Sequence, residues 1–176
     1  PPSVTALFSQ VAVGGGYSTI LSLTNTGSDS LTGNLILTRA DGTTLDTTLS
    51  SPSASGSESQ VFASSTSVTI APGGTKIITA TAPTLNDAVT GWARVESTGG
   101  QLSGVATFQL RDSGGLKTVV GVLSGESEDV VTIPVNDDST QSRFTGYAVA
   151  NIGSDPLRIT IFLVDGNGTV TKTLSQ

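Results

Sequence analysis

The sequence predicts an all-β protein: an antiparallel, Ig-like β-sandwich followed by a truncated second copy of the same unit. Apolar residues alternate with Ser, Thr and Gly over short runs, which is the period of a strand and not of a helix. Gly, Asn, Asp or Pro stand at the breaks between these runs. A seven-residue motif also recurs far along the chain, which indicates an internal repeat.

Thirteen short strands are expected, which is typical of a sandwich. The turns between them are chemically explicit, because pairs such as Asp41-Gly42 and Asn167-Gly168 supply residues that tolerate positive φ. The expected strands cover residues 4–13, 17–25, 31–39, 43–49, 67–71, 75–81, 89–97, 101–110, 116–123, 129–135, 143–152, 156–165 and 169–175.

The repeat is the most informative feature. NTGSDSL at residues 25–31 returns as NIGSDPL at residues 151–157, identical at five of seven positions, and Asn25 to Asn151 is an offset of 126 residues. The register holds on both sides without a gap. The aligned pairs include Thr19 and Thr145, Leu23 and Val149, Leu35 and Ile161, Leu37 and Leu163, and Gly42 and Gly168.

This alignment predicts two parts. Residues 1–125 form a complete sandwich unit, and residues 126–176 form a half repeat of four strands without counterparts to the later strands of the unit. A half sandwich exposes its apolar face and its edges, so it should pack on unit one or on a neighbouring subunit. The Ser-rich stretch at residues 50–60 is expected to be a flexible linker.

Composition excludes several classes of function. The chain has no Cys and no His, which rules out Cys nucleophiles, His-dependent triads and His- or Cys-ligated zinc. A net charge of −6 disfavours nucleic-acid binding, and no apolar window is long enough to span a membrane. With 24 Ser and 27 Thr and few catalytic side chains, the chain is expected to be a non-enzymatic extracellular protein.

The succession of motifs resembles a known group of proteins. VAVGGGYSTILSLTNTGS, IAPGG, TGWARVES with SGVATFQLR, and TGYAVANIGS with a DGNG turn look like the tandem β-sandwich repeats of secreted and cell-surface proteins of environmental bacteria. The resemblance covers most of the chain and implies no defined activity. In such proteins the second unit normally continues through further strands, and this chain departs from the pattern there.

The leading hypothesis is a structural subunit that self-assembles into a filament or surface layer. A segment of one chain would complete the sheet of the next by β-strand complementation, and a head-to-tail contact of this kind does not close. The uncharged run ITIFLV at residues 159–164 fits either such a contact or a strand buried on both faces. The expected interface residues are Val4, Ala6, Phe8, Val11 and Val13 with Tyr147, Val149, Ile159, Ile161, Phe162 and Leu163.

The alternative is a monomeric cell-surface adhesion or carbohydrate-binding module. Trp92 is the only Trp, and alternation along strand 89–97 places Trp92, Arg94 and Glu96 together on the face opposite the apolar residues. An aromatic ring beside charged partners is a candidate platform for stacking sugars. Trp92 could equally pack beneath a loop or in a subunit contact.

No cofactor is expected apart from a weak candidate calcium site. The acidic clusters Glu126, Glu128 and Asp129, and Asp137 and Asp138, flank an expected strand and offer the hard oxygens that calcium prefers, although loop carboxylates are more often simply solvated. Glycans are candidate modifications, because the chain is rich in Ser and Thr and contains the sequon at residues 167–169.

Overall fold

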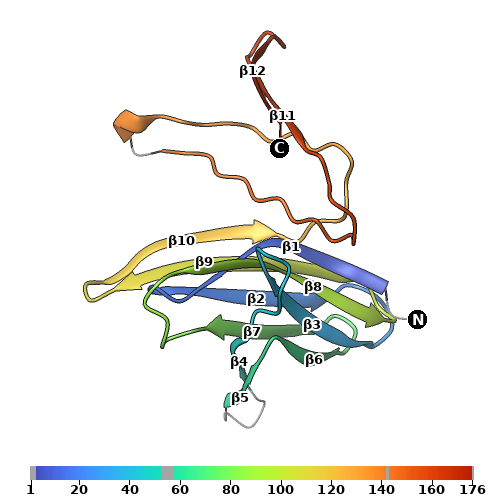
Figure 1. Cartoon of the computed structure of the whole chain (residues 1–176). Coiled ribbons are helices and arrows are strands. Elements are labelled where there is room, and N and C mark those ends of the chain that lie inside the picture. The colour runs from blue at the N-terminus through green and yellow to red at the C-terminus, as the bar shows by residue number, and fades with distance from the viewer. Residues whose placement is uncertain (1–2, 53–57, 142, 176) are drawn as a thin grey trace.

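The computed structural model describes residues 3–52, 58–141 and 143–175. The fold is all-β, as predicted: ten strands form two antiparallel sheets packed face to face, and two further strands form a hairpin near the C-terminus (Figure 1). The helical content of the described residues is one short 3-10 helix, η1, Ser139–Gln141. Within the described residues, no helix is long and apolar enough to cross a membrane.

The sandwich strands follow one another with short connections. They are β1 (Ser3–Val13), β2 (Tyr17–Asn25), β3 (Leu31–Arg39), β4 (Thr47–Pro52), β5 (Glu58–Ala63), β6 (Ser65–Ile70), β7 (Thr75–Thr81), β8 (Val89–Thr98), β9 (Leu102–Asp112) and β10 (Gly115–Leu123).

The core lies between the two sheets because each central strand alternates in burial. In β2 the buried positions are every second residue from Thr19 to Asn25, and β8 shows the same period. Leucines from both sheets fill the space between them with no exposed surface, among them Leu21, Leu35 and Leu37. Fully burying one such side chain contributes about 1.5–3 kcal/mol.

The strand order has an internal symmetry. One sheet runs β1-β8-β3-β6 and the other runs β10-β9-β2-β7-β4-β5. Each strand can be exchanged with the one five places away in the chain, β1 with β6, β2 with β7 and so on. After the exchange each sheet has the same strand order, read from its other end. We therefore describe the sandwich as two interlocked halves, the first half (β1–β5) and the second half (β6–β10).

The two halves hold each other together. In the described residues, the hairpins β4–β5 and β9–β10 are the sandwich ladders that lie within one half. Every other ladder joins a strand of the first half to a strand of the second. Neither half can therefore form most of its backbone hydrogen bonds alone.

The sequence keeps a trace of these halves. The triplet Leu31-Thr32-Gly33 in β3 matches Val89-Thr90-Gly91 in β8, an offset of 58 residues from Gly33 to Gly91. At the same offset, the Asp41-Gly42 turn matches Gly99-Gly100. Gly42, Gly99 and Gly100 all adopt positive φ, so these turns use the conformational freedom of glycine.

Some strand boundaries differ from the prediction. The strand expected at 43–49 is β4 at Thr47–Pro52, because residues 43–45 instead close the turn that follows β3. The stretch expected to be a linker, residues 50–60, is partly strand: β4 reaches Pro52 and β5 begins at Glu58. Residues 53–57 of that stretch lie outside the described residues.

The C-terminal segment, residues 126–175, begins where the chain leaves the sandwich. Leu7 N–H donates to Gly125 O at 3.1 Å, and Gly125 N–H donates to Leu7 O at 2.9 Å, which ties the start of the segment to the free edge of β1. The segment then loops away and returns through the hairpin of β11 (Thr160–Val164) and β12 (Val170–Ser175), which projects from the sandwich (Figure 1).

Two strands predicted in this segment, 129–135 and 143–152, are wrong: neither is a strand in the structure. The repeat alignment explains why. Their counterparts β1 and β2 belong to the first half, and in the sandwich both pair only with strands of the second half. A strand without a partner has no ladder, and the described residues contain no counterpart of the second half for this segment.

Candidate functional site

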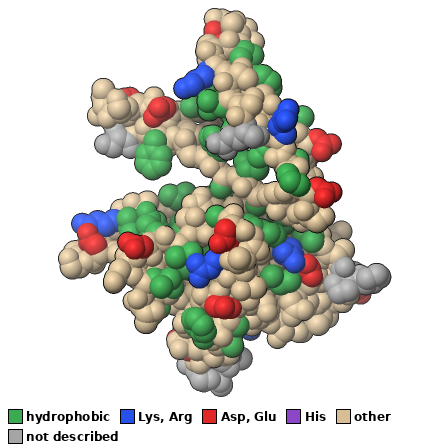
Figure 2. All heavy atoms as spheres, viewed as in Figure 1, with side chains coloured by type: hydrophobic (Ala, Val, Ile, Leu, Met, Phe, Trp, Pro, Cys, Tyr) green, Lys and Arg blue, Asp and Glu red, His purple; other side chains and the backbone are tan. Residues whose placement is uncertain are grey.

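The C-terminal segment exposes apolar side chains whose repeat counterparts are buried. Hydrophobic side chains lie at its surface above the sandwich (Figure 2), and they include most of the large exposed ones among the described residues. Monomeric domains rarely leave such a set open to water. The counterparts, with their exposed fractions, are Leu23 (0%) and Val149 (54%), Leu31 (0%) and Leu157 (58%), and Leu37 (0%) and Leu163 (44%).

The local hydrogen bonds of the segment repeat those of the first half. Asn25 and Asn151 each donate through Nδ2 to the carbonyl four residues on, at 2.7 and 2.8 Å, and each accepts at Oδ1 from the N–H two residues on, at 3.0 Å. Gly42 and Gly168 each donate to the carbonyl three residues back at 3.0 Å, with φ of 85° and 84°. The same residues therefore make the same turns in both places.

One threonine makes the same two hydrogen bonds to a single backbone residue in the sandwich and in the segment. Thr19 Oγ1 accepts from Ala12 N at 3.0 Å and donates to Ala12 O at 2.9 Å. Thr145 Oγ1 accepts from Asn136 N at 2.8 Å and donates to Asn136 O at 3.2 Å. The two paired residues are nine positions apart in the segment and seven apart in the sandwich.

What the segment lacks is the long-range half of this network. In the sandwich, Asn25 is fully buried, its Nδ2 also donates to Ile70 O at 3.0 Å, and its Oδ1 accepts from Gln101 N at 3.4 Å. Both of these partners belong to the second half or to the turns that join its strands. Within the part of the chain that the structure describes, Asn151 makes only the local bonds and is exposed, so it has capacity for a carbonyl and an N–H from a partner.

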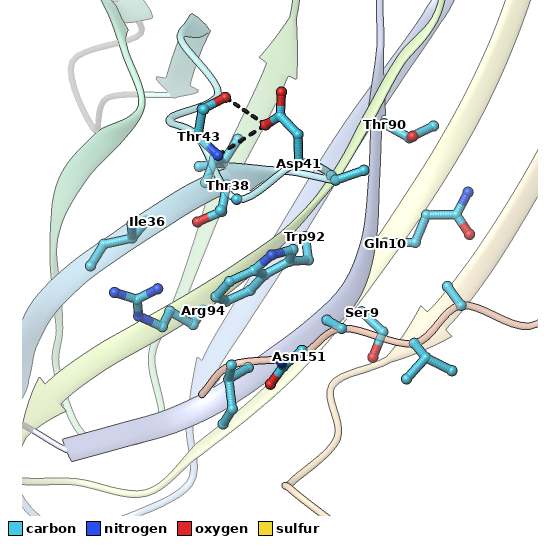
Figure 3. A pocket seen from close by; sticks show the side chains of 18 of the residues that line it. Ser9, Gln10, Ile36, Thr38, Asp41, Thr43, Thr90, Trp92, Arg94 and Asn151 are labelled. Atoms are coloured by element: carbon cyan, nitrogen blue, oxygen red, sulfur yellow. Dashed lines mark hydrogen bonds between the residues drawn. The ribbon is translucent and has the colours of Figure 1, made fainter. Parts of the chain in front are cut away.

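Trp92, Arg94 and Glu96 lie on the outer face of the four-stranded sheet, as alternation predicts. Arg94 Nε donates to Glu96 Oε1 at 2.6 Å, and its guanidinium carbon lies 5.4 Å from the centroid of the Trp92 ring. Residues 147–153 pass over this face and leave an open groove of about 790 Å³ (Figure 3). Trp92 is half-buried there, because Arg94 and residues 147–153 cover part of its ring.

The predicted interface residues fall into two groups. Ala6, Phe8, Val11 and Val13 of β1 are buried in the core of their own sandwich, and β1 pairs with β8; Val4 remains partly exposed. The structure therefore uses β1 within the chain. The residues of the C-terminal segment are exposed or half-buried, namely Tyr147, Val149, Ile159, Ile161, Phe162 and Leu163.

A second apolar surface was missed from the sequence. The edge strand β10 exposes nearly all of its side chains, including Leu116, Val120 and Leu123. The run Val119-Val120-Gly121-Val122-Leu123 was the available signal, because a strand with one wet face should alternate. Its inner side is open because β1 ends the facing sheet.

The acidic clusters do not assemble in the part of the chain that the structure describes. No group of three His, Cys, Asp or Glu side chains comes together there. Asp138 instead accepts from the Thr140 hydroxyl at 2.6 Å, which lowers the pKa of Asp138, and Thr43 lowers the pKa of Asp41 in the same way. These carboxylates cap their own turns. The sequon residue Asn167 is exposed in the turn between β11 and β12.

The chain matches no known protein family, no curated protein and no solved structure.

Proposed function

We propose that the protein is a non-enzymatic, extracellular structural subunit that self-assembles by β-strand complementation, with the C-terminal segment as the acceptor. One observation carries the proposal: apolar residues that are fully buried in the sandwich have repeat counterparts in the segment that stand open to water. Covering them with a partner would recover about 1.5–3 kcal/mol for each large side chain.

The recurring turns support the same proposal. The segment repeats local hydrogen bonds of the first half, and the described residues hold no counterparts to the strands that pair with that half in the sandwich. Strand addition supplies a ladder of backbone hydrogen bonds together with apolar burial. It suits a chain that has no cysteine and hence no disulfide.

The form of the assembly follows from which strands are free. A head-to-tail filament built by donating β1 would require β1 to leave its pairing with β8 and to uncover Phe8 and Val11. The proposal therefore places the contact at the C-terminal segment. Growth into a filament or surface layer requires a second contact, for which the exposed edge of β10 is the candidate.

Replacing Leu163 with Asp tests this proposal. Leu163 is exposed in the single chain, so Leu163→Asp should leave the monomer folded, whereas in an assembly it would bury an unpaired charge. We expect the dissociation constant measured by sedimentation to rise by about 100-fold or more, equivalent to about 3 kcal/mol.

Asn167→Asp is the matched control, because Asn167 is exposed in the turn between β11 and β12, outside the paired residues, and the substitution adds the same charge. It should assemble nearly as the parent chain does. Assembly of Leu163→Asp at parental affinity would contradict an apolar contact through the segment.

A binding module is the second candidate, supported by the open groove that contains Trp92. Thr38, Asp41 and Arg94 line it with Trp92, which gives a ring and hydrogen-bonding groups of the kind that hold sugars. The stacking of Arg94 on the ring and the passage of residues 147–153 over it make this function the weaker one. A parent chain that stays monomeric at every concentration would favour it.

A further inference from the structure

The symmetry of the sandwich indicates what kind of partner a half fold accepts. The first half is completed by a half with the same strand order, and each sheet reads the same after the two are exchanged. The C-terminal segment aligns with the first half from β1 into β4. Two copies of the chain would therefore bring together two such segments, which can pair with each other through the edge that β3 offers to β8.

We propose that the partner of the C-terminal segment is the same segment of a second copy, joined by a two-fold contact in which Phe162 of one copy faces Phe162 of the other. The inference rests on the proposed function and adds to it the identity, symmetry and register of the partner.

The register follows from the pairing of β3 with β8. In that ladder Ile36 faces Arg94, and these two residues are 58 apart, the offset that relates the halves. Exchanging the two halves therefore maps the Ile36–Arg94 pair onto itself, so a residue at this position pairs with its own counterpart. The repeat offset of 126 carries Ile36 to Phe162, so Phe162 occupies the self-paired position. The same rule pairs Ile161 with the partner's Leu163.

Among the described residues, no strand pairs with the edge of β11 that this contact needs. In the sandwich Thr38 pairs with Trp92 of β8, and on its other edge with Thr44. In the hairpin, the repeat counterpart of the second contact is present, because Val164 pairs with Val170. β12 therefore occupies the edge away from the β8 position, which is the edge that β6 takes in the sandwich. The edge that would meet the partner's β11 is left open without undoing the hairpin.

The pairing is short for a physical reason. Ile159 stands where the sandwich has Gly33, and a Cβ at Gly33 would lie 2.1 Å from the backbone O of Glu96. The facing strand cannot approach as closely there. β11 itself runs from Thr160 to Val164, so the five residues centred on Phe162 form the proposed ladder.

Single cysteines test the register directly, since the parent chain has none. Phe162→Cys should form a disulfide-linked dimer under mild oxidation, because the two side chains face each other within bonding distance. Thr160→Cys and Val164→Cys are the matched controls. In the proposed ladder, each of these cysteines lies four residues, about 14 Å along the strand, from the same cysteine in the other chain. Neither variant should therefore cross-link alone. A mixture of the two variants should cross-link, because residue 160 then faces residue 164.

We expect about tenfold or more linked dimer from Phe162→Cys than from either control, read on a non-reducing gel after the parent chain has been sized by sedimentation. Equal linking by all three variants, or none from Phe162→Cys in a chain that does dimerise, would overturn the two-fold register and leave self-assembly standing. A parent chain that is monomeric at all concentrations would overturn both. Far-UV circular dichroism confirms that each variant is folded.

Discussion

Asn25 shows how one side chain joins parts of the chain that are distant in sequence. Its side-chain amide hydrogen-bonds to backbone groups in the turn that follows β2, at the end of β6 and in the turn between β8 and β9. Asn25 is fully buried while it makes these bonds. A buried amide is tolerated only when its groups are paired. Asn151 repeats the local part of this network in the open.

Substituting each asparagine separates these roles. Asn25→Ala should lower the free energy of unfolding of the sandwich by about 2–3 kcal/mol, because it leaves buried backbone groups unpaired. Asn151→Ala should change it by less than about 0.5 kcal/mol, since its bonds are exposed and local. Urea unfolding followed by Trp92 fluorescence measures both. Equal losses would mean that Asn151 is already buried in the folded chain.

At this scale the sequence predicted much of the fold and part of the site. Alternation placed Trp92, Arg94 and Glu96 on one face correctly, because period two is a local property of a strand. It could not show that Arg94 stacks on Trp92 or that residues 147–153 cover them, since both depend on where distant chain segments run.

At the scale of elements, a strand exists only where another strand accepts it. The runs 129–135 and 143–152 have the right alternation, but their counterparts β1 and β2 are held by the second half. The segment at 58–63 was expected to belong in part to a linker and is instead β5, because β4 is present to pair with it. Patterning predicts which strands can form, and pairing decides which do.

The close approach of β3 and β8 is the element contact most sensitive to substitution. A Cβ at Gly33 would meet the backbone O of Glu96 at 2.1 Å, and one at Gly91 would meet the backbone O of Thr38 at 2.1 Å. Backbone atoms of a central ladder cannot move aside without breaking hydrogen bonds. The two glycines thus hold the halves together at equivalent points.

Gly33→Ala and Gly91→Ala should each destabilise the sandwich by about 1–3 kcal/mol, and by similar amounts because the two contacts are equivalent. Gly121→Ala is the control: a Cβ there lies 3.7 Å from its nearest neighbour, in ordinary contact, so stability should be unchanged or slightly raised. Thermal unfolding measures all three. A harmless Gly33→Ala would show that β3 and β8 lie further apart than described.

At the scale of the whole molecule, the symmetry of the contact determines the size of the assembly. A two-fold contact between C-terminal segments buries the same surface on both copies and closes as a dimer. Longer arrays require a different contact on the same chain, and β10 is the exposed apolar edge available for it. An assembly of this kind would alternate two contacts, and it would not repeat one head-to-tail joint.

Charge gives a test of this arrangement that needs no substitution. The chain carries a net charge of −6, and residues 126–175 contribute seven carboxylates against three cations, a net charge of −4. Two such segments repel each other, so an association driven by apolar burial should strengthen when salt screens that repulsion. Raising sodium chloride from about 0.05 M to about 0.5 M should lower the dimer dissociation constant several-fold in sedimentation, as the Debye length shrinks from about 14 Å to about 4 Å. Sodium sulfate should tighten the dimer further, because it also favours apolar burial. A dissociation constant that rises with salt would mean that ion pairs, and not the apolar residues around Phe162, join the two chains.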